Sequence, residues 1–387
     1  MNNKSADRTD AVINVIEDFD PTVQSKEYNE RFKEWRRSKN PCAFRFETNS
    51  REKVFNDSRG FENKSQTETE KRVISNIMHI VGIAMLIYVV TDKILGTAAI
   101  FILDFIGVDI HTSLFSSGIY GGSVEIVTAM LVITSLTLII PLVYLHLKMK
   151  MPLKVEFMSR VNDSAEILSA IGMAMVVCTI VCLPTAYSSS TRDIYNYFSS
   201  VDSDLSAWNQ REFVVYTFFD ILAVSTLTEL CLRGAVFGAL RQFGDRFAFA
   251  ISTIVAMLLA NDFREYPAAI LISVVASVGM IRSGTILTAI FVRIIYKLYL
   301  FALIILQGDP TPSMVLKRNF FMIGIFLLGV LIAGVVQILG KRKDKKVLAI
   351  YKSESTPMSR VTYALKCSPF IAIAGICLVQ AMVVLFF

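Results

Sequence analysis

The segment TELCLRG, from Thr228 to Gly234, places a glutamate and an arginine inside a stretch that is otherwise typical of a membrane helix. Glu229 and Arg233 are four residues apart, so they lie on one helix face in the order that favours an ion pair. Charged side chains at membrane depth are costly to bury, which makes this pair a functional candidate. The pair suits either a carboxylate that activates water or an ion pair that holds helices together. A pair that only extends to the membrane interface is the third interpretation.

The elements that would position these residues are membrane helices. Hydrophobic residues make up 53% of the 387 residues and come in long blocks, which is the pattern of bilayer-spanning helices. We therefore expect an all-α fold, a polytopic transmembrane helical bundle of about nine spans. The expected spans are residues 73–91, 124–146, 165–187, 213–232, 246–260, 267–281, 285–306, 319–340 and 367–387. The apolar stretch 95–110, interrupted by Asp104 and Asp109, is expected to be interfacial or re-entrant.

Four regions follow from this division of the chain. They are a polar cytoplasmic N-terminal tail (1–72), N-terminal membrane helices (73–212), core helices (213–306), and C-terminal membrane helices (307–387) with a basic cytoplasmic loop at 341–366. Lysine and arginine gather in that loop and in 147–164, whereas 92–123 and 188–212 carry few of them. The positive-inside tendency therefore predicts a multi-pass protein of the cell membrane, with its N-terminus in the cytoplasm and its C-terminus outside.

The polar tail contains one amphipathic segment, from Glu27 to Asn40. We expect it to be part of a partly disordered, solvated tail. A helix that lies on the membrane surface or on a partner is the alternative.

The net charge of +6 does not indicate nucleic-acid binding, because the basic residues lie beside apolar blocks as in cytoplasmic membrane flanks. The expected partners are the lipid bilayer and another membrane protein. The six cysteines show no spacing of a disulfide framework or of a zinc site.

Three landmarks between about residue 225 and residue 300 resemble, in order and spacing, the CPBP family of CAAX-protease and bacteriocin-processing intramembrane endopeptidases. The family motif EExxxRG is matched by TELCLRG. The arginine-and-glycine turn of the family is matched by ALRQFGDR from Ala239, and a later turn by IRSGTILTAIFVRIIYK from Ile281 to Lys297. The resemblance implies a CPBP-like core of membrane helices. It also implies peptide hydrolysis, in which a glutamate and a histidine polarise water and a further histidine and asparagine complete the site.

The first motif is only partly preserved in this chain. Thr228 stands where the family has its first glutamate, so Glu229 is the only motif carboxylate, followed by Arg233 as in the motif. Glu229 and Arg233 are therefore the candidate catalytic residues that the resemblance leaves.

The later motif positions hold residues that cannot perform the implied chemistry. The histidine of FxxxH falls on Ala260, with Asn261 beside it, and the later histidine and asparagine are replaced by Arg293 and Lys297. No histidine follows residue 146. An arginine does not deprotonate in proteins and repels a divalent ion, so no metal site is expected here.

The two cations suggest a different role for the surviving carboxylate. Arg293 and Lys297 share one helix face, and the family packing would bring this face to Glu229. We therefore expect an interhelical ion cluster of Glu229 with Arg293 or Lys297, in which Arg233 orients the carboxylate. Asp220 lies about half a turn round the helix from Glu229 and is not expected to share this site.

These observations favour a catalytically inactive membrane protein that acts as a scaffold or regulator of a partner protein and needs no cofactor. The first alternative is an active endopeptidase with a rearranged site, using Glu229 with Thr228 or Asn261 and, in that case, zinc. The second alternative is a transporter whose intramembrane charges line a pathway.

Overall fold

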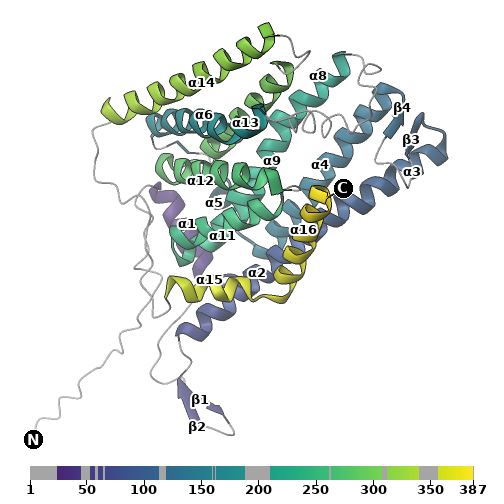
Figure 1. Cartoon of the computed structure of the whole chain (residues 1–387). Coiled ribbons are helices and arrows are strands. Elements are labelled where there is room, and N and C mark those ends of the chain that lie inside the picture. The colour runs from purple at the N-terminus through teal and green to yellow at the C-terminus, as the bar shows by residue number, and fades with distance from the viewer. Residues whose placement is uncertain are drawn as a thin grey trace, which may run out of the picture.

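The computed structural model describes residues 24–44, 53–56, 60–63, 66–112, 119–158, 160–161, 163–187, 210–260, 263–306, 312–339 and 356–386. Figure 1 shows that helices make up nearly all of this part of the chain, with two small β-hairpins at the periphery. The expected all-α bundle is thus confirmed. The predicted site residue Asn261 lies outside the described residues.

Seven long helices form the bundle, namely α2 (Gln66–Val90), α4 (Ser123–Met149), α6 (Ser164–Tyr187), α12 (Tyr266–Ser283), α13 (Leu287–Leu306), α14 (Pro312–Leu339) and α16 (Ser368–Phe386). The shorter ones are α1 (Lys26–Arg37), α3 (Gly96–Ile106), α5 (Leu153–Glu156), α11 (Asp245–Leu258), the 3₁₀ turn η5 (Phe263–Glu265) and α15 (Pro357–Leu365). Strands β1 (Lys53–Asn56) and β2 (Gly60–Asn63) pair antiparallel, as do β3 (Ile110–Thr112) and β4 (Ile119–Gly121).

One composite helix carries the motif TELCLRG. It runs from α8 (Gln210–Phe219) through the π-helix η2 (Asp220–Val224), α9 (Ser225–Glu229) and the π-helix η3 (Leu230–Phe237) to α10 (Gly238–Leu240) and the 3₁₀ turn η4 (Arg241–Phe243). A π-helical turn closes i→i+5 hydrogen bonds and holds more residues than an α-helical turn. The two π segments therefore change which side chains of this helix share a face.

Six helical segments of the described chain are long and apolar enough to cross a membrane, or up to seven if the bent pair α15–α16 is one span. They are Thr67–Ile106, Ser123–Met149, Ser164–Cys182, Val214–Phe243, Tyr266–Ser283 and Val315–Ile338. The protein is accordingly a multi-pass membrane protein, while the predicted count of nine spans stays a prediction. Among the nine, α11 has only 14 residues, which is short for a bilayer core of ~30 Å.

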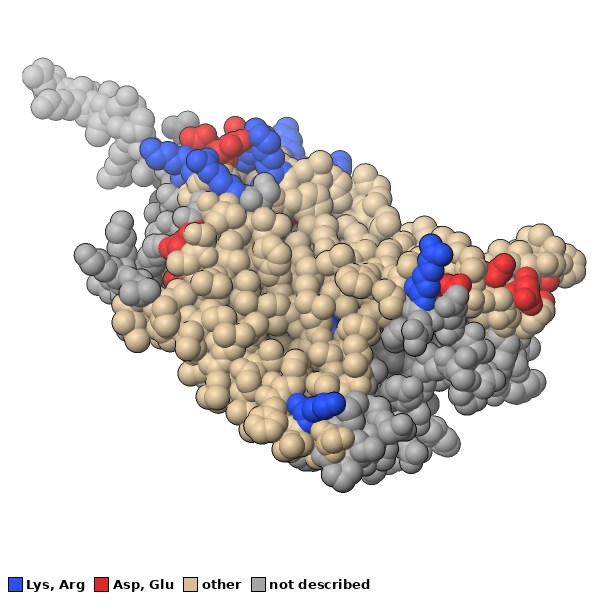
Figure 2. Space-filling view, turned by 90° about the horizontal axis from the view of Figure 1, so that it is seen from above, with Lys and Arg blue, Asp and Glu red and all other residues tan. Residues whose placement is uncertain are grey.

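The outer surface of the bundle is apolar. On α14, Phe320, Leu327 and Leu331 are each at least 60% exposed. Figure 2 shows uncharged residues over the broad middle of one face, with most of the charged side chains toward its edges. This distribution fits a belt that faces lipid tails.

The stretch 95–110 extends α2 instead of forming a separate re-entrant loop. The π-helix η1 (Thr91–Leu95) joins α2 to α3, so that Thr67–Ile106 is one helical segment of 40 residues. Gly107, at φ 91°, ends α3 because glycine adopts this left-handed conformation without a Cβ clash. The chain then enters the β3–β4 hairpin.

The amphipathic segment of the tail packs on the chain's own membrane helices. Tyr28, Phe32 and Trp35, spaced at i, i+4 and i+7, are at most 5% exposed. Trp35 Nε1 donates to the carbonyl of Met149 over 3.1 Å, and Asn40 Nδ2 donates to the same carbonyl over 2.5 Å. The expectation of a solvated tail is therefore wrong for residues 24–44, because an apolar stripe of this size gains free energy by burial.

The 3₁₀ turn η4 is bound by the N-terminal arm on one side and by α15 on the other. Gln242 exchanges hydrogen bonds with the backbone of the N-terminal arm, residues 24–44: it accepts from Phe44 N (2.7 Å) and donates to Cys42 O (2.8 Å). From α15, Arg360 Nη1 donates to Phe243 O over 3.0 Å, and its Nε lies 2.5 Å from a carboxylate oxygen of Glu70 on α2. Figure 1 shows α1 and α15 on the same side of the bundle.

A single apolar core includes residues from each of the four regions predicted from the sequence, such as Phe32, Ile77, Phe237 and Phe370. The arm and the membrane helices are thus packed together. This shared core holds in place the helices that surround the candidate site.

Candidate functional site

Four of the predicted site residues line one cavity. Thr228 from α9, Ala260 after α11, and Arg293 and Lys297 from α13 border a cavity of about 230 Å³. The family resemblance placed these positions together, and the structure brings them to one partly open cavity. Side chains of α2, α4, η3, α11 and α12 form most of the remaining wall.

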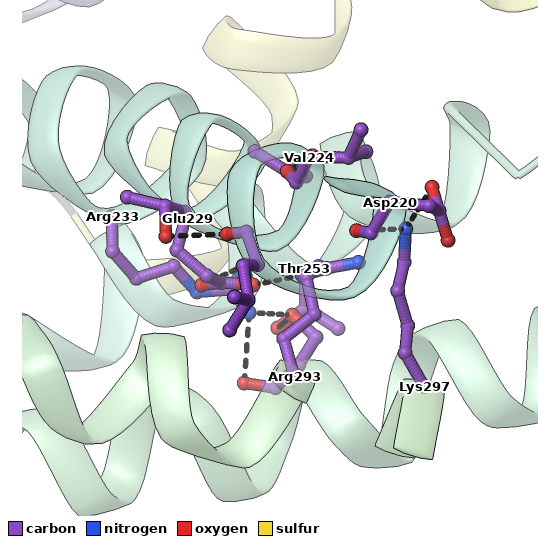
Figure 3. A network of polar contacts seen from close by, with 11 residues as sticks. Asp220, Val224, Glu229, Arg233, Thr253, Arg293 and Lys297 are labelled. Carbon is purple, nitrogen blue, oxygen red and sulfur yellow. Dashed lines mark hydrogen bonds and ion pairs between the residues drawn. The ribbon is translucent and has the colours of Figure 1, made fainter. Parts of the chain in front are cut away.

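Glu229 is the centre of the ion cluster beside this cavity. Its carboxylate has no exposed surface, and Oε1 accepts a hydrogen bond from Arg293 Nε. Arg233 Nη1 lies 3.4 Å from Oε1 and 3.2 Å from Oε2. Figure 3 shows both guanidinium groups approaching the carboxylate from different elements. The expected contact between Glu229 and Arg293, with Arg233 against the same carboxylate, is therefore present.

Arg233 also connects three helices. Its Nη2 donates to the carbonyl of Ser273 over 3.0 Å and to Ser273 Oγ over 2.5 Å. Ser273 Oγ in turn donates to Thr253 Oγ1 over 3.2 Å. Because Ser273 belongs to α12 and Thr253 to α11, the guanidinium of Arg233 fixes η3 against both.

Lys297 has a different partner from the one that the sequence suggested. Its Nζ donates to Asp220 Oδ1 over 2.6 Å and to the Asp220 carbonyl over 3.1 Å. The two side chains are only 20% and 23% exposed. Lys297 and Asp220 therefore form a second ion pair along α13, next to that of Glu229 and Arg293.

The expectation that Asp220 and Glu229 point to different sides is wrong, and the π-helix η2 is the reason. In a regular α-helix nine residues correspond to two and a half turns. The π turn takes up more residues per turn, so less rotation separates the two positions. Both carboxylates consequently face α13 and find one cation each.

The cluster brings together three guanidinium or ammonium groups with two carboxylates. Glu229, with 0% exposure, balances Arg233 and Arg293, and Asp220 balances Lys297. Every carboxylate in the cluster thus has a close cation. Such an arrangement stabilises helix contacts and offers directed N–H groups to the neighbouring cavity, since an arginine carries five donors and a lysine three.

None of the chain's three histidines lines this cavity, although all three lie in described segments. His146 Nδ1 contacts Glu156 Oε2 over 2.6 Å at the end of α4, and His111 contacts Asp104 over 2.9 Å beside α3. Within the part of the chain that the structure describes, no three His, Cys, Asp or Glu side chains are grouped so that they would hold a metal ion. The Glu-and-His pair implied by the resemblance is not assembled here.

Three polar connections in the structure were not predicted from the sequence. Arg241 Nε donates to Asp245 over 2.7 Å, and the i, i+4 spacing was the available signal. The Gln242 contacts with the arm and the pair of His146 with Glu156 join segments far apart in the chain or across a turn, so no local pattern marks them.

Comparisons of the chain with protein-family models, with curated proteins and with solved structures give no match.

Proposed function

We propose that this membrane protein has a CPBP-like core, performs no proteolysis, and acts by binding as a scaffold or regulator of a partner membrane protein. The proposal rests on Glu229. A general base must offer a free oxygen to a water molecule within hydrogen-bond reach. Oε1 of Glu229 already accepts from Arg293 and Arg233. Oε2 accepts no hydrogen bond, but it is buried against Arg233 and Glu229 does not line the cavity, so it offers no oxygen to water in the cavity.

The identity of the neighbouring cations also supports the proposal. Arg293 and Lys297 line the cavity where the family resemblance would put imidazole and amide groups. Neither side chain offers a lone pair at neutral pH, so neither takes up the proton of an attacking water. The cavity is therefore lined by cationic groups that can bind a ligand, at the positions where the family resemblance would put the groups for hydrolysis.

The orientation belongs to the same proposal. The end of the bundle that holds the arm, α5 and η4 includes Lys148, Lys150 and Lys154. The positive-inside tendency puts this end in the cytoplasm of a cell-membrane protein, with the C-terminus outside. A partner is expected to meet either this cytoplasmic end or the apolar faces of the spans.

The active endopeptidase is the alternative that an experiment must separate from this proposal. Thr228 lines the cavity, but its Oγ1 donates to Val224 O over 2.7 Å. For a rearranged site, Glu229 would have to leave its buried ion pairs with both arginines and turn toward the cavity.

The test is a peptidase assay with the purified full-length protein in lipid nanodiscs. Wild type and Glu229→Gln are incubated with a library of reporter peptides, with and without added zinc. We expect cleavage at background level for both proteins. Cleavage by wild type that disappears in a folded Glu229→Gln variant would overturn the proposal in favour of the endopeptidase.

A further inference from the structure

The cavity beside the ion cluster has one polar side and one apolar side. From α13 come Arg293, Tyr296 and Lys297, whereas α2 and α4 contribute mainly aliphatic side chains such as Met85 and Leu138. Its volume of about 230 Å³ corresponds to roughly eight groups of the size of a water molecule, at about 30 Å³ each. These dimensions fit a segment of one hydrocarbon chain with a single polar head.

The charged groups on the wall differ from those behind it. Arg293, Lys297 and Glu265 line the cavity, but Glu229 and Asp220, the partners of the two cations, do not. The wall itself thus carries two positive groups and one negative group. Because Glu229 and Asp220 lie directly behind their cations, the site as a whole carries no excess of positive charge, and an anionic head group meets directed N–H donors there instead.

Arg293 has hydrogen-bond donors left for a ligand. The contacts described for its side chain use Nε, which donates to Glu229, so its two terminal nitrogens remain available within the described part of the chain. Its side chain is 19% exposed, and it borders the cavity. Lys297 is less suited, because its ammonium group donates to two oxygens of Asp220. The planar fork of arginine matches carboxylate and phosphate oxygens.

We infer that this cavity binds an anionic amphiphile with one hydrocarbon chain, whose head group contacts the terminal nitrogens of Arg293. The chain of the ligand lies along the aliphatic side chains of α2 and α4. The surrounding bilayer supplies such molecules, either as long-chain fatty carboxylates or as single-chain phospholipids with a terminal phosphate. This inference rests on the proposed function, because both use the contact in which Glu229 holds Arg293 in place.

The experiment measures displacement of a fluorescent fatty acid from the purified full-length protein in nanodiscs of a neutral phospholipid. The competitors are palmitate, lysophosphatidic acid, hexadecanol and a hexadecyl ammonium ion, which share a long chain and differ in head group. Palmitate, lysophosphatidic acid or both should compete at least about tenfold more strongly than the alcohol and the ammonium ion. Competition by only one of the two anions would identify the source of the ligand.

Two variants test the site itself. Arg293→Gln should weaken binding of the preferred anion about tenfold or more, because it removes the charged donors. Ala260→Leu leaves all charges in place and fills part of the cavity, so it should also weaken binding. This variant provides the test of the site if Arg293→Gln does not fold. Lys317→Gln, on the exposed side of α14, is the control and should bind as wild type does.

Four results would overturn the inference: equal competition by hexadecanol and palmitate, no displacement by any competitor, unchanged binding in a folded Arg293→Gln variant, or unchanged binding in Ala260→Leu. The peptidase assay separates its failure from that of the proposed function. Absence of both cleavage and anion binding would refute the ligand site alone. Cleavage together with Arg293-dependent anion binding would refute the inactive scaffold and keep the ligand site.

Discussion

Arg293 donates its Nε–H to Oε1 of Glu229, a carboxylate that has no exposed surface and lies 64 residues earlier in the chain. The contact joins α13 to α9, and Arg233 approaches the same carboxylate from one turn along its own helix. In a buried cluster of this kind, loss of the shared member leaves the others without a counter-charge. The stability of the bundle should therefore depend more on Glu229 than on either arginine.

Glu229→Gln should destabilise the protein by ~3–5 kcal/mol, because two guanidinium groups lose their counter-ion in a buried site. Arg293→Gln should have a smaller effect, since Glu229 keeps Arg233 and the side chain of Arg293 is already 19% exposed. Thermal unfolding of the purified variants in one detergent measures both effects, with Lys317→Gln as the surface control. A Glu229→Gln variant as stable as the control would contradict the cluster.

The partner of Lys297 can be identified by a double-mutant cycle. Asp220→Asn and Lys297→Gln should each destabilise the protein, and the double variant should recover part of the loss, with a coupling of ~0.5–3 kcal/mol. The cycle of Glu229→Gln with Lys297→Gln should be closer to additive, because Lys297 donates to Asp220 and not to Glu229. Stronger coupling of Lys297 to Glu229 than to Asp220 would show that the pairs are arranged differently in solution.

The contrast between these two pairs shows what the sequence can predict. The types and spacing of Glu229 and Arg233, together with the packing that the family resemblance implies for Arg293, predicted a buried cluster between two helices. The pairing of Lys297 with Asp220 was not predictable from a regular helix. It depends on the π turn at Asp220–Val224, and no residue pattern known to us in that segment marks such a turn.

The N-terminal arm shows a second limit. Its stripe of Tyr28, Phe32 and Trp35 was visible as an amphipathic pattern, but a pattern does not say which surface will cover it. That surface is assembled from the end of α4, α5 and η4, which are far apart in the sequence. The number of spans is difficult to predict for a related reason. Short helices such as α11 pack within the bundle and need not match the bilayer thickness.

Gln242→Ala should loosen the N-terminal arm. The substitution leaves the N–H of Phe44 and the carbonyl of Cys42 without their side-chain partner, and each unpaired buried group costs about 1–3 kcal/mol. Hydrogen–deuterium exchange of the α1 amides should therefore become faster than in wild type. Lys154→Gln is the matched control, since it breaks only the exposed pair with Glu27 and should leave this exchange unchanged. Equal exchange in Gln242→Ala and wild type would show that the other contacts suffice to hold the arm.

The contact between the buried Glu156 and the partly exposed His146 predicts a pH dependence of stability. Burial raises the pKa of the Glu156 carboxyl above its ordinary value of 4.5, while contact with His146 acts in the opposite direction. A carboxyl whose pKa is higher in the folded than in the unfolded state binds protons preferentially when folded. Its stabilising contribution is complete below pH 4.5 and is lost as the pH rises through the raised pKa.

Glu156→Gln removes this titration, so its stability relative to wild type should increase between pH 4.5 and neutral pH. His146→Gln should move the transition of Glu156 to higher pH, because the group that lowers the pKa is lost. Unfolding temperatures of the three proteins, measured at closely spaced pH values in one detergent, provide the comparison. Glu27→Gln is the control of opposite sign: contact with Lys154 lowers the pKa of Glu27, so its contribution fades on acidification. Parallel pH profiles for wild type and Glu156→Gln would mean that Glu156 keeps an ordinary pKa and that water reaches it in the folded protein.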